Sequence, residues 1–159
     1  MGDRSLDSLS RDFYPLACEW IARVTSRGVA VMIVQTSRTL AEHQLNVANG
    51  TSNTTLSPHL PRIMRWQPGF LLDPIDQTKS DAMDLAPYDQ YQLHGPDKLK
   101  WDAKDPAWSV SGWEAEKLGL RWGGRWYQPF DPGHGELVLP WKRLLLNAER
   151  ARPWPTFRA

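Results

Sequence analysis

The stretch SRDFYPLACEWIARVTSRGVAVMIV, residues 10–34, decides the fold. In its first half, apolar side chains recur three and four positions apart, which predicts an amphipathic helix; they are Phe13, Leu16, Ala17, Trp20, Ile21 and Val24. Ser10 is a suitable N-cap for this helix, and Gly28 is a suitable stop. Residues 29–34 are continuously apolar and rich in β-branched side chains, so they predict a buried strand directly after the helix.

Shorter patterns in the rest of the chain predict further helices and strands. They favour a helix over 39–49, a long loop over 51–80, a strand over 82–86, a helix over 105–117, paired strands over 120–122 and 136–139, and a final helix over 140–150. Ser37 or Thr39 would cap the second helix, and Gly50 would end it. This order predicts an α+β fold in which helices pack on one small antiparallel sheet.

Length and composition limit the classes of protein to consider. With 159 residues and no linker-like tract, the chain predicts a single domain over 1–159, with its core at about 10–150. The only cysteine, Cys18, excludes an internal disulfide framework and a cysteine-based zinc site. Lys and Arg number 19 against 18 Asp and Glu, so the overall charge does not favour nucleic acid, and no nucleic-acid-binding signature is present.

No segment has the pattern of a membrane span or a signal peptide. The longest apolar stretch, 28–34, is far shorter than the ~20 residues that cross a bilayer. Residues 1–10 are polar and mixed in charge. We therefore expect a protein that is made in the cytoplasm and initially stays there, with a monomer as the default state.

Three side chains offer a metal site. His59, Asp84 and His134 supply two imidazoles and one carboxylate, a set that suits zinc and leaves a fourth position open for water. Asp131 lies three residues before the second of these histidines and is a candidate general base. Glu136 alternates with His134 along the expected strand, so we expect it on the same side, where it would orient the imidazole.

Other polar residues are interpreted as solvated. His43 and His94 have no second histidine at metal spacing, which indicates exposed side chains. Three loop carboxylates are interpreted in the same way, namely Asp73, Asp76 and Asp81. Asp81 is the substitute ligand if Asp84 faces away. The C-terminal cations indicate a solvated helix face and tail; they are Lys142, Arg143, Arg150, Arg152 and Arg158.

Two apolar groups leave alternatives open. Loop 60–79 carries side chains that would form a folded-back core segment, a substrate lid or a membrane-touching patch, with core packing favoured; they are Ile63, Met64, Trp66, Phe70, Leu71 and Leu72. Trp122 and Trp126 flank a Gly-Gly turn, and both a structural role and a place in a groove wall are compatible with that position.

Several motifs together resemble a family of zinc peptidases. Its S-x-H-x-x-G-x-A-x-D pattern is similar to Ser57-Pro58-His59 and Ala82-Met83-Asp84, and its W-G-G-x-W and D-x-x-H patterns are similar to residues 122–126 and 131–134. An early R-T-x-x-E-Q motif resembles residues 38–44. The family comprises D-alanyl-D-alanine carboxypeptidases and L-alanyl-D-glutamate endopeptidases of Hedgehog/DD-peptidase fold, including phage endolysins. The resemblance runs from about Phe13 to Val138.

This resemblance implies a role for each matching residue. His59, Asp84 and His134 would hold one zinc ion, Asp131 would be the catalytic base, and Arg38 would bind substrate oxygen atoms and stabilise the anionic intermediate. Ser57 would support the loop that presents His59. The chain departs from the pattern in the long separation of His59 from Asp84, in Ser80 at a usual glycine, and in His134-Gly135-Glu136 where H-F-E is common.

The resemblance also implies a function. The expected activity is hydrolysis of the peptidoglycan stem peptide, preferably at the L-alanyl-D-glutamate bond, by a phage endolysin that waits in the cytoplasm and has no separate wall-binding domain. The alternatives are a D,D-carboxypeptidase or D,D-dipeptidase with the same zinc site and a non-catalytic wall-binding domain. The basic C-terminus would add weak contact with the cell envelope.

Overall fold

A four-stranded antiparallel sheet forms the centre of the protein. The computed structural model describes residues 2–52, 56–89, 99–127 and 130–155. The strands are β1 (Val31–Gln35), β2 (Ala82–Pro87), β3 (Arg121–Trp122) and β4 (His134–Glu136), and they lie in the order β1-β2-β4-β3. All neighbouring pairs are antiparallel. The expected α+β class with a small antiparallel sheet is therefore confirmed.

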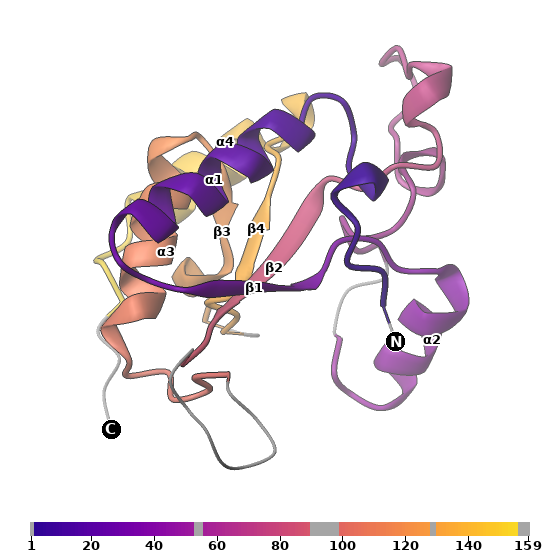
Figure 1. The fold of residues 1–159 in the computed structure, drawn as a ribbon. Coiled ribbons are helices and arrows are strands. Elements are labelled where there is room, and N and C mark those ends of the chain that lie inside the picture. The colour runs from indigo at the N-terminus through magenta and orange to yellow at the C-terminus, as the bar shows by residue number, and fades with distance from the viewer. Residues whose placement is uncertain (1, 53–55, 90–98, 128–129, 156–159) are drawn as a thin grey trace.

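In the described part of the chain, four α-helices accompany the sheet: α1 (Tyr14–Ser26), α2 (Leu40–Ala48), α3 (Pro106–Lys117) and α4 (Arg143–Arg150). Figure 1 shows α1 and α3 together over the sheet, whereas α2 lies beyond one end of β1. Helix α1 contacts α3 and β1, and its apolar face shares one core with side chains of β2 and β3, so the predicted helix supplies much of that core. The core residues are Leu9, Phe13, Ala17, Trp20, Val24, Met83, Leu85, Ala115, Leu120 and Trp122.

The predicted element boundaries need small corrections. Helix α1 begins at Tyr14 and its N-cap is Phe13, while the Ser10 hydroxyl accepts a hydrogen bond from the Phe13 N–H, one turn earlier. Thr39, rather than Ser37, caps α2, and it forms a capping box with Glu42. The strand expected over 136–139 is β4, which instead begins at His134 because that residue pairs with Asp84 of β2.

The apolar side chains of segment 60–79 that follow Arg62 are not part of the core. Leu71 is 95% exposed and Ile63 is 59% exposed, so the core packing expected for its apolar side chains is wrong. Figure 1 shows this segment projecting away from the sheet. Only Trp66 and Phe70 have an aromatic partner among the described residues, since both rings lie about 5 Å from the Trp141 ring.

A buried arginine holds the base of this segment. Arg62 is 2% exposed, and its Nε donates to both carboxylate oxygens of Asp81, at 3.0 and 2.9 Å. Arg65 Nη2 donates to the same carboxylate at 2.5 Å, and Arg62 Nη1 donates to Asp76 at 3.2 Å. Asp76 and Asp81 are therefore buried ion-pair partners, and their interpretation as solvated loop residues is wrong. We call this group of four residues the Arg62 clasp.

Candidate metal centre and pocket

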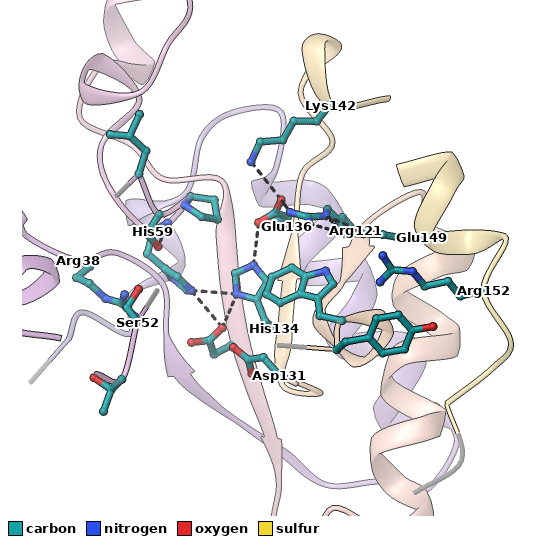
Figure 2. Close-up of a pocket in the computed structure, with 17 residues that line it drawn as sticks. Arg38, Ser52, His59, Arg121, Asp131, His134, Glu136, Lys142, Glu149 and Arg152 are labelled. Atoms are coloured by element: carbon teal, nitrogen blue, oxygen red, sulfur yellow. Dashed lines mark hydrogen bonds and ion pairs between the residues drawn. The ribbon is translucent and has the colours of Figure 1, made fainter. Parts of the chain in front are cut away.

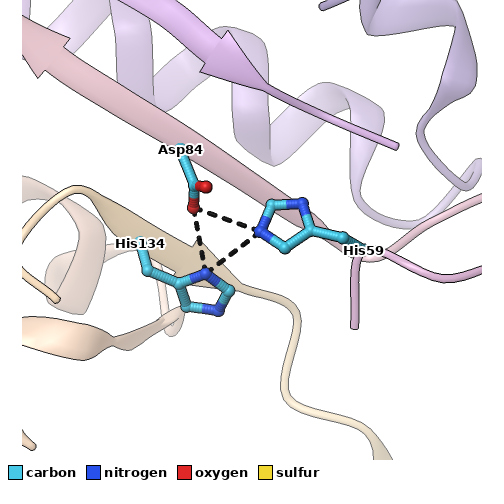
Figure 3. Close-up of side chains that lie close together, drawn as sticks. All are labelled: His59, Asp84 and His134. Carbon is cyan, nitrogen blue, oxygen red and sulfur yellow. Dashed lines mark hydrogen bonds and ion pairs between the residues drawn. The ribbon is translucent and has the colours of Figure 1, made fainter. Parts of the chain in front are cut away.

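Three predicted ligands meet at one point between the loop before segment 60–79, strand β2 and strand β4. His59 Nε2 lies 3.1 Å from Asp84 Oδ1 and 3.3 Å from His134 Nδ1, and the last two atoms lie 3.0 Å apart (Figure 3). Asp84 and His134 are directly opposed in the ladder between β2 and β4, so sheet pairing itself brings these two side chains together. The structure thus brings the three residues together despite the long segment that separates His59 from Asp84.

The spacing and chemistry of these atoms fit a zinc ion. Two ligands of a tetrahedral zinc lie ~3.3 Å apart when the metal–ligand bonds are ~2.0 Å long. Each imidazole also has its other nitrogen in a hydrogen bond: His59 Nδ1 donates to the carbonyl oxygen of Thr36 at 2.9 Å, and His134 Nε2 donates to Glu136 Oε2 at 2.9 Å. When each ring is neutral, as a bound metal requires, these nitrogens carry the protons and the other nitrogen of each ring directs its lone pair at the shared centre.

The carboxylates around the two histidines favour a positive charge at this site, on either a protonated imidazole or a bound cation. Burial lowers the pKa of His134, but its hydrogen bonds to Asp84 and Glu136 outweigh this effect and raise the pKa to about 10. Burial raises the pKa of Asp84, but the neighbouring imidazoles of His59 and His134 hold it well below its usual range. The carboxylates of Asp84 and Glu136 therefore remain ionised. A divalent cation would balance this negative charge and would be bound by the two imidazoles and the Asp84 carboxylate.

Asp131 enters the same pocket from the turn that precedes β4. It lines the pocket together with all three ligands, and Figure 2 shows it beside His134. Burial raises the pKa of Asp131, the negative charge of Asp84 adds to this, and the imidazoles of His134 and His59 partly offset it. A carboxylate with a raised pKa beside a metal site suits a general base.

The Gly-Gly turn after Trp122 explains how Asp131 is placed. The Asp131 N–H donates to the Gly123 carbonyl at 3.1 Å. A Cβ atom at Gly123 would lie 2.2 Å from the Asp131 carbonyl oxygen and 3.1 Å from the His134 Cβ. Only glycine therefore allows the turn to pack directly against the chain that carries the base and a ligand.

The two tryptophans of this turn have different environments. Trp122 is 1% exposed, donates from Nε1 to the Pro132 carbonyl at 2.7 Å and stacks on Trp154, so its place is in the core. It does not line the pocket. Trp126 does line it, with its ring 5.0 Å from the His134 ring and beneath the guanidinium of Arg121. Of the two expected groove walls, the structure places only Trp126 at the pocket.

Arg38 lines the side of the pocket next to the loop that carries His59. Its N–H donates to the His59 carbonyl at 2.9 Å, and its guanidinium donates to the side-chain oxygen of Gln35. Nη1 of Arg38 lies 3.5 Å from His43 Nδ1. His43 is only 2% exposed, so its interpretation as a solvated residue is wrong. His94 lies outside the described residues.

His59 is held by its own loop. The Ser57 hydroxyl accepts from the His59 N–H at 3.3 Å, and the Ser57 carbonyl accepts from the Leu60 N–H at 2.9 Å. The Arg62 clasp closes the other side of this loop, because Arg65 Nε donates to the Leu60 carbonyl at 2.7 Å and the Asp81 N–H donates to the Pro58 carbonyl at 3.0 Å. Ser57 is thus in position to support the loop.

Glu136 belongs to an ion-pair network that the motifs do not reveal. It is 1% exposed and accepts from Arg121 Nη1 at 2.9 Å and from Lys142 Nζ at 3.3 Å, in addition to His134. Arg121 also binds Glu149 of α4 through Nε at 2.8 Å. The sequence signal for Arg121 is its place opposite Glu136 in the β3–β4 ladder, which requires the strand register.

The C-terminal cations mostly point inward. Lys142 binds Glu136, Arg150 Nη2 donates to the Glu116 carbonyl at 2.8 Å, and Arg152 Nη1 donates to the Arg125 carbonyl at 3.0 Å. Their interpretation as a solvated face is therefore wrong. Arg143 is exposed, and Arg158 lies outside the described residues. The helices of the described residues all lack the length and hydropathy of a membrane-spanning segment.

Together these groups surround a pocket of about 570 Å³, a size suited to a short peptide. Figure 2 shows Arg38 and Arg152 on opposite sides of this pocket, with His59, His134 and Asp131 between them. Among the described residues, the cations that line it are Arg38, Arg121, Lys142 and Arg152, and the carboxylates are Asp84, Asp131, Glu136 and Glu149. The arrangement combines a metal site, a base and fixed positive charges in one cavity.

Comparison with known proteins supports this chemistry. Residues 79–137, which carry two of the ligands and Asp131, match a family described as D-alanyl-D-alanine carboxypeptidase. Over these residues, the match confirms the family resemblance drawn from the motifs. The crystal structure of the Serratia marcescens L-Ala D-Glu endopeptidase ChiX has a similar fold, with a TM-score of 0.53 and 19% sequence identity over 86% of this chain and 88% of that chain. No curated protein sequence matches the chain.

Proposed function

We propose that the protein is a zinc-dependent peptidase that cuts the L-alanyl-D-glutamate bond of the peptidoglycan stem peptide. The observation that carries the proposal is the convergence of His59 Nε2, Asp84 Oδ1 and His134 Nδ1 beside Asp131. Zinc bound there would polarise the scissile carbonyl and lower the pKa of a water molecule. The likeness to an endopeptidase of that name supports the choice of bond.

The residues of the pocket divide the reaction between them. Asp131 accepts a proton from the attacking water and later passes a proton to the leaving amine, so that the C–N bond breaks without release of an unstable amide anion. Arg38 binds the substrate oxygen on which negative charge develops, and its planar fork suits that task. Glu136 keeps the His134 ring in one orientation through the hydrogen bond at Nε2.

A D,D-carboxypeptidase is the second candidate, because the matching family carries that description. Digestion of purified muropeptides distinguishes the two activities. We expect mass spectrometry to show products that end at L-alanine and begin at D-glutamate, with no free D-alanine. Release of free D-alanine as the main product would favour the second candidate. Loss of all cleavage with a chelator, and its return with added zinc, would support the metal requirement for either bond.

For the biological role, we propose a phage endolysin that reaches the wall from the cytoplasm after a separate protein permeabilises the inner membrane. Gram-negative cells with permeabilised outer membranes should lose turbidity when the wild-type protein is added from outside. They should not do so with Asp131→Asn, which retains the metal ligands. Equal loss of turbidity with both proteins would contradict an enzymatic role in lysis.

A further inference from the structure

The cations around the pocket differ in whether the protein itself neutralises them. Arg121 binds Glu136 and Glu149, at 2.9 and 2.5 Å, and Lys142 binds Glu136 at 3.3 Å. These two cations are occupied in orienting Glu136 and in tying α4 to the sheet. Their positive charge is therefore not available to a ligand without breaking a buried ion pair.

Arg152 has no such partner. Among residues 2–52, 56–89, 99–127 and 130–155, no carboxylate forms an ion pair with it. Its Nη1 donates to the Arg125 carbonyl at 3.0 Å, and its guanidinium lies 4.5 Å from the centre of the Tyr127 ring. These contacts fix the guanidinium without neutralising it, which preorganises the group for an anion.

The position of Arg152 makes a substrate group its natural partner. Arg152 lines the same pocket as the three ligands and Asp131, and Figure 2 shows it on the side away from Arg38. The indole Nε1 of Trp126, another residue of this pocket, is buried and has no hydrogen-bond partner in the described part of the chain. A buried donor without an acceptor indicates that a ligand supplies one.

We propose that Arg152 binds a carboxylate of the substrate on the leaving-group side of the scissile bond. The assignment rests on the proposed function, in which D-glutamate is the residue directly after that bond. D-glutamate continues the stem peptide through its side-chain carboxyl group, so its α-carboxylate is free unless it is amidated. Arg38 binds the carbonyl side of the scissile bond, so Arg152, on the other side of the pocket, binds this α-carboxylate. The preferred substrates are therefore stem peptides with D-glutamate rather than D-isoglutamine.

A pair of synthetic tripeptides tests the assignment, L-Ala-γ-D-Glu-meso-diaminopimelate and its D-isoglutamine counterpart. A hydrogen-bonded charge pair is typically worth a factor of about 10 to 100, so kcat/KM of the zinc-loaded wild type should favour the glutamate peptide by about that ratio. In Arg152→Gln the ratio should approach one, mainly through a higher KM. Arg152→Lys should keep part of it, because lysine retains the charge without the planar fork.

Arg143→Gln is the matched control, since Arg143 is an exposed arginine at the start of α4 outside the pocket, and its ratio should equal that of the wild type. Equal kcat/KM for the two peptides in the wild type, or an unchanged preference in Arg152→Gln, would overturn the assignment.

A binding measurement separates this assignment from the choice of bond. Calorimetric titration with the dipeptides γ-D-Glu-meso-diaminopimelate and γ-D-isoglutaminyl-meso-diaminopimelate measures the subsite directly, whether or not the L-alanyl-D-glutamate bond is cut. We expect about tenfold weaker binding of the amidated dipeptide to the wild type, and equal binding of both to Arg152→Gln. Equal binding of both by the wild type would overturn the assignment even if cleavage occurs as proposed.

Discussion

At the scale of single residues, the protons on the two histidine rings determine what the cluster can do. His59 and His134 each have one nitrogen committed to a fixed acceptor, Thr36 O or Glu136 Oε2, and the other aimed at Asp84. A fourth residue, Asp131, lines the same pocket, but its carboxylate is not one of the three groups whose ligand atoms converge. In the proposed function, His59, Asp84 and His134 therefore hold the cation, whereas Asp131 moves the proton.

Replacement of the proposed base tests this division. We expect Asp131→Asn to lower kcat by about 100- to 10,000-fold, the usual contribution of a general base, while zinc binds as in the wild type. Activity needs the ionised form of Asp131, so it should be lost as pH falls through the raised pKa of this carboxyl. The acid limb of kcat/KM should consequently lie above the ordinary aspartate value of ~3.9. A pH–rate profile that stays flat down to that value would count against Asp131 as the base.

A second prediction concerns the residue that orients His134. Glu136→Gln should weaken zinc binding by about 10- to 100-fold, because the amide no longer holds the His134 Nε2–H with a charge-assisted hydrogen bond. Metal competition with a fluorescent chelator measures the affinity, and circular dichroism checks that the fold persists. Unchanged affinity in a folded variant would show that Glu136 serves only the ion pairs with Arg121 and Lys142.

At the scale of elements, the sheet supplies two of the proposed ligands, and a loop anchored by the Arg62 clasp supplies the third. Asp84 and His134 face each other across the β2–β4 ladder, but His59 lies on a loop followed by segment 60–79. The Arg62 clasp returns the chain to Asp81, three residues before Asp84, so the length of the segment does not loosen the site. The clasp thus accounts for a long insertion between two ligands of one centre.

Breaking the clasp should therefore affect both stability and metal binding. Arg62→Ala leaves Asp81 buried with only Arg65 as its charged partner, and we expect the free energy of unfolding to fall by about 3–5 kcal/mol. Zinc affinity should fall as well, since the loop that carries His59 loses its anchor. Denaturant titration and chelator competition measure the two effects.

The matched control is Arg11→Ala. Arg11 forms an exposed ion pair with Asp73 of the same segment, and such a pair is worth about 0–1 kcal/mol. If Arg62→Ala loses stability but binds zinc as tightly as the wild type, the clasp is structural and does not position His59.

The turn between β3 and β4 provides a further prediction. Gly123→Ala should cost at least about 1–3 kcal/mol of stability and disturb both Asp131 and His134, because the new Cβ would overlap the Asp131 carbonyl oxygen. Gly28→Asn is a suitable control, since Gly28 has a φ of 82° with open space around it and asparagine tolerates this conformation. Thermal unfolding of both variants measures the difference, and equal melting temperatures would refute the close packing of this turn.

Sequence patterns predicted helices and caps well where interactions between neighbouring residues determine them. The helical spacing from Phe13 to Val24 and the cap at Thr39 need no knowledge of distant residues. The burial of Asp76 and Asp81 could not be predicted in this way, because their arginine partners lie 14 to 19 residues away along the chain. The polar composition of the loop predicted that both carboxylates are solvated, whereas the ion pairs with Arg62 keep them buried.

At the scale of the whole molecule, the pocket joins parts of the chain that are distant in sequence. The loop at His59, strand β2, the turn at Asp131, strand β4 and the end of α4 all contribute side chains to it. Motifs near the ligands identified the metal donors, but Arg121, Lys142 and Glu149 became recognisable only when α4 was seen against the sheet. The C-terminal region therefore contributes side chains to the pocket itself.

Zinc binding by the purified protein tests the central claim most directly. The wild type and Asp131→Asn, stripped with chelator and titrated with zinc in a calorimeter, should each bind one ion per chain with similar affinity, whereas His59→Ala should bind orders of magnitude more weakly. Elemental analysis after dialysis should likewise find about one zinc per chain in the wild type and Asp131→Asn, and much less in His59→Ala. Equal zinc affinity in His59→Ala and the wild type, or no zinc binding by a folded wild type, would contradict the account.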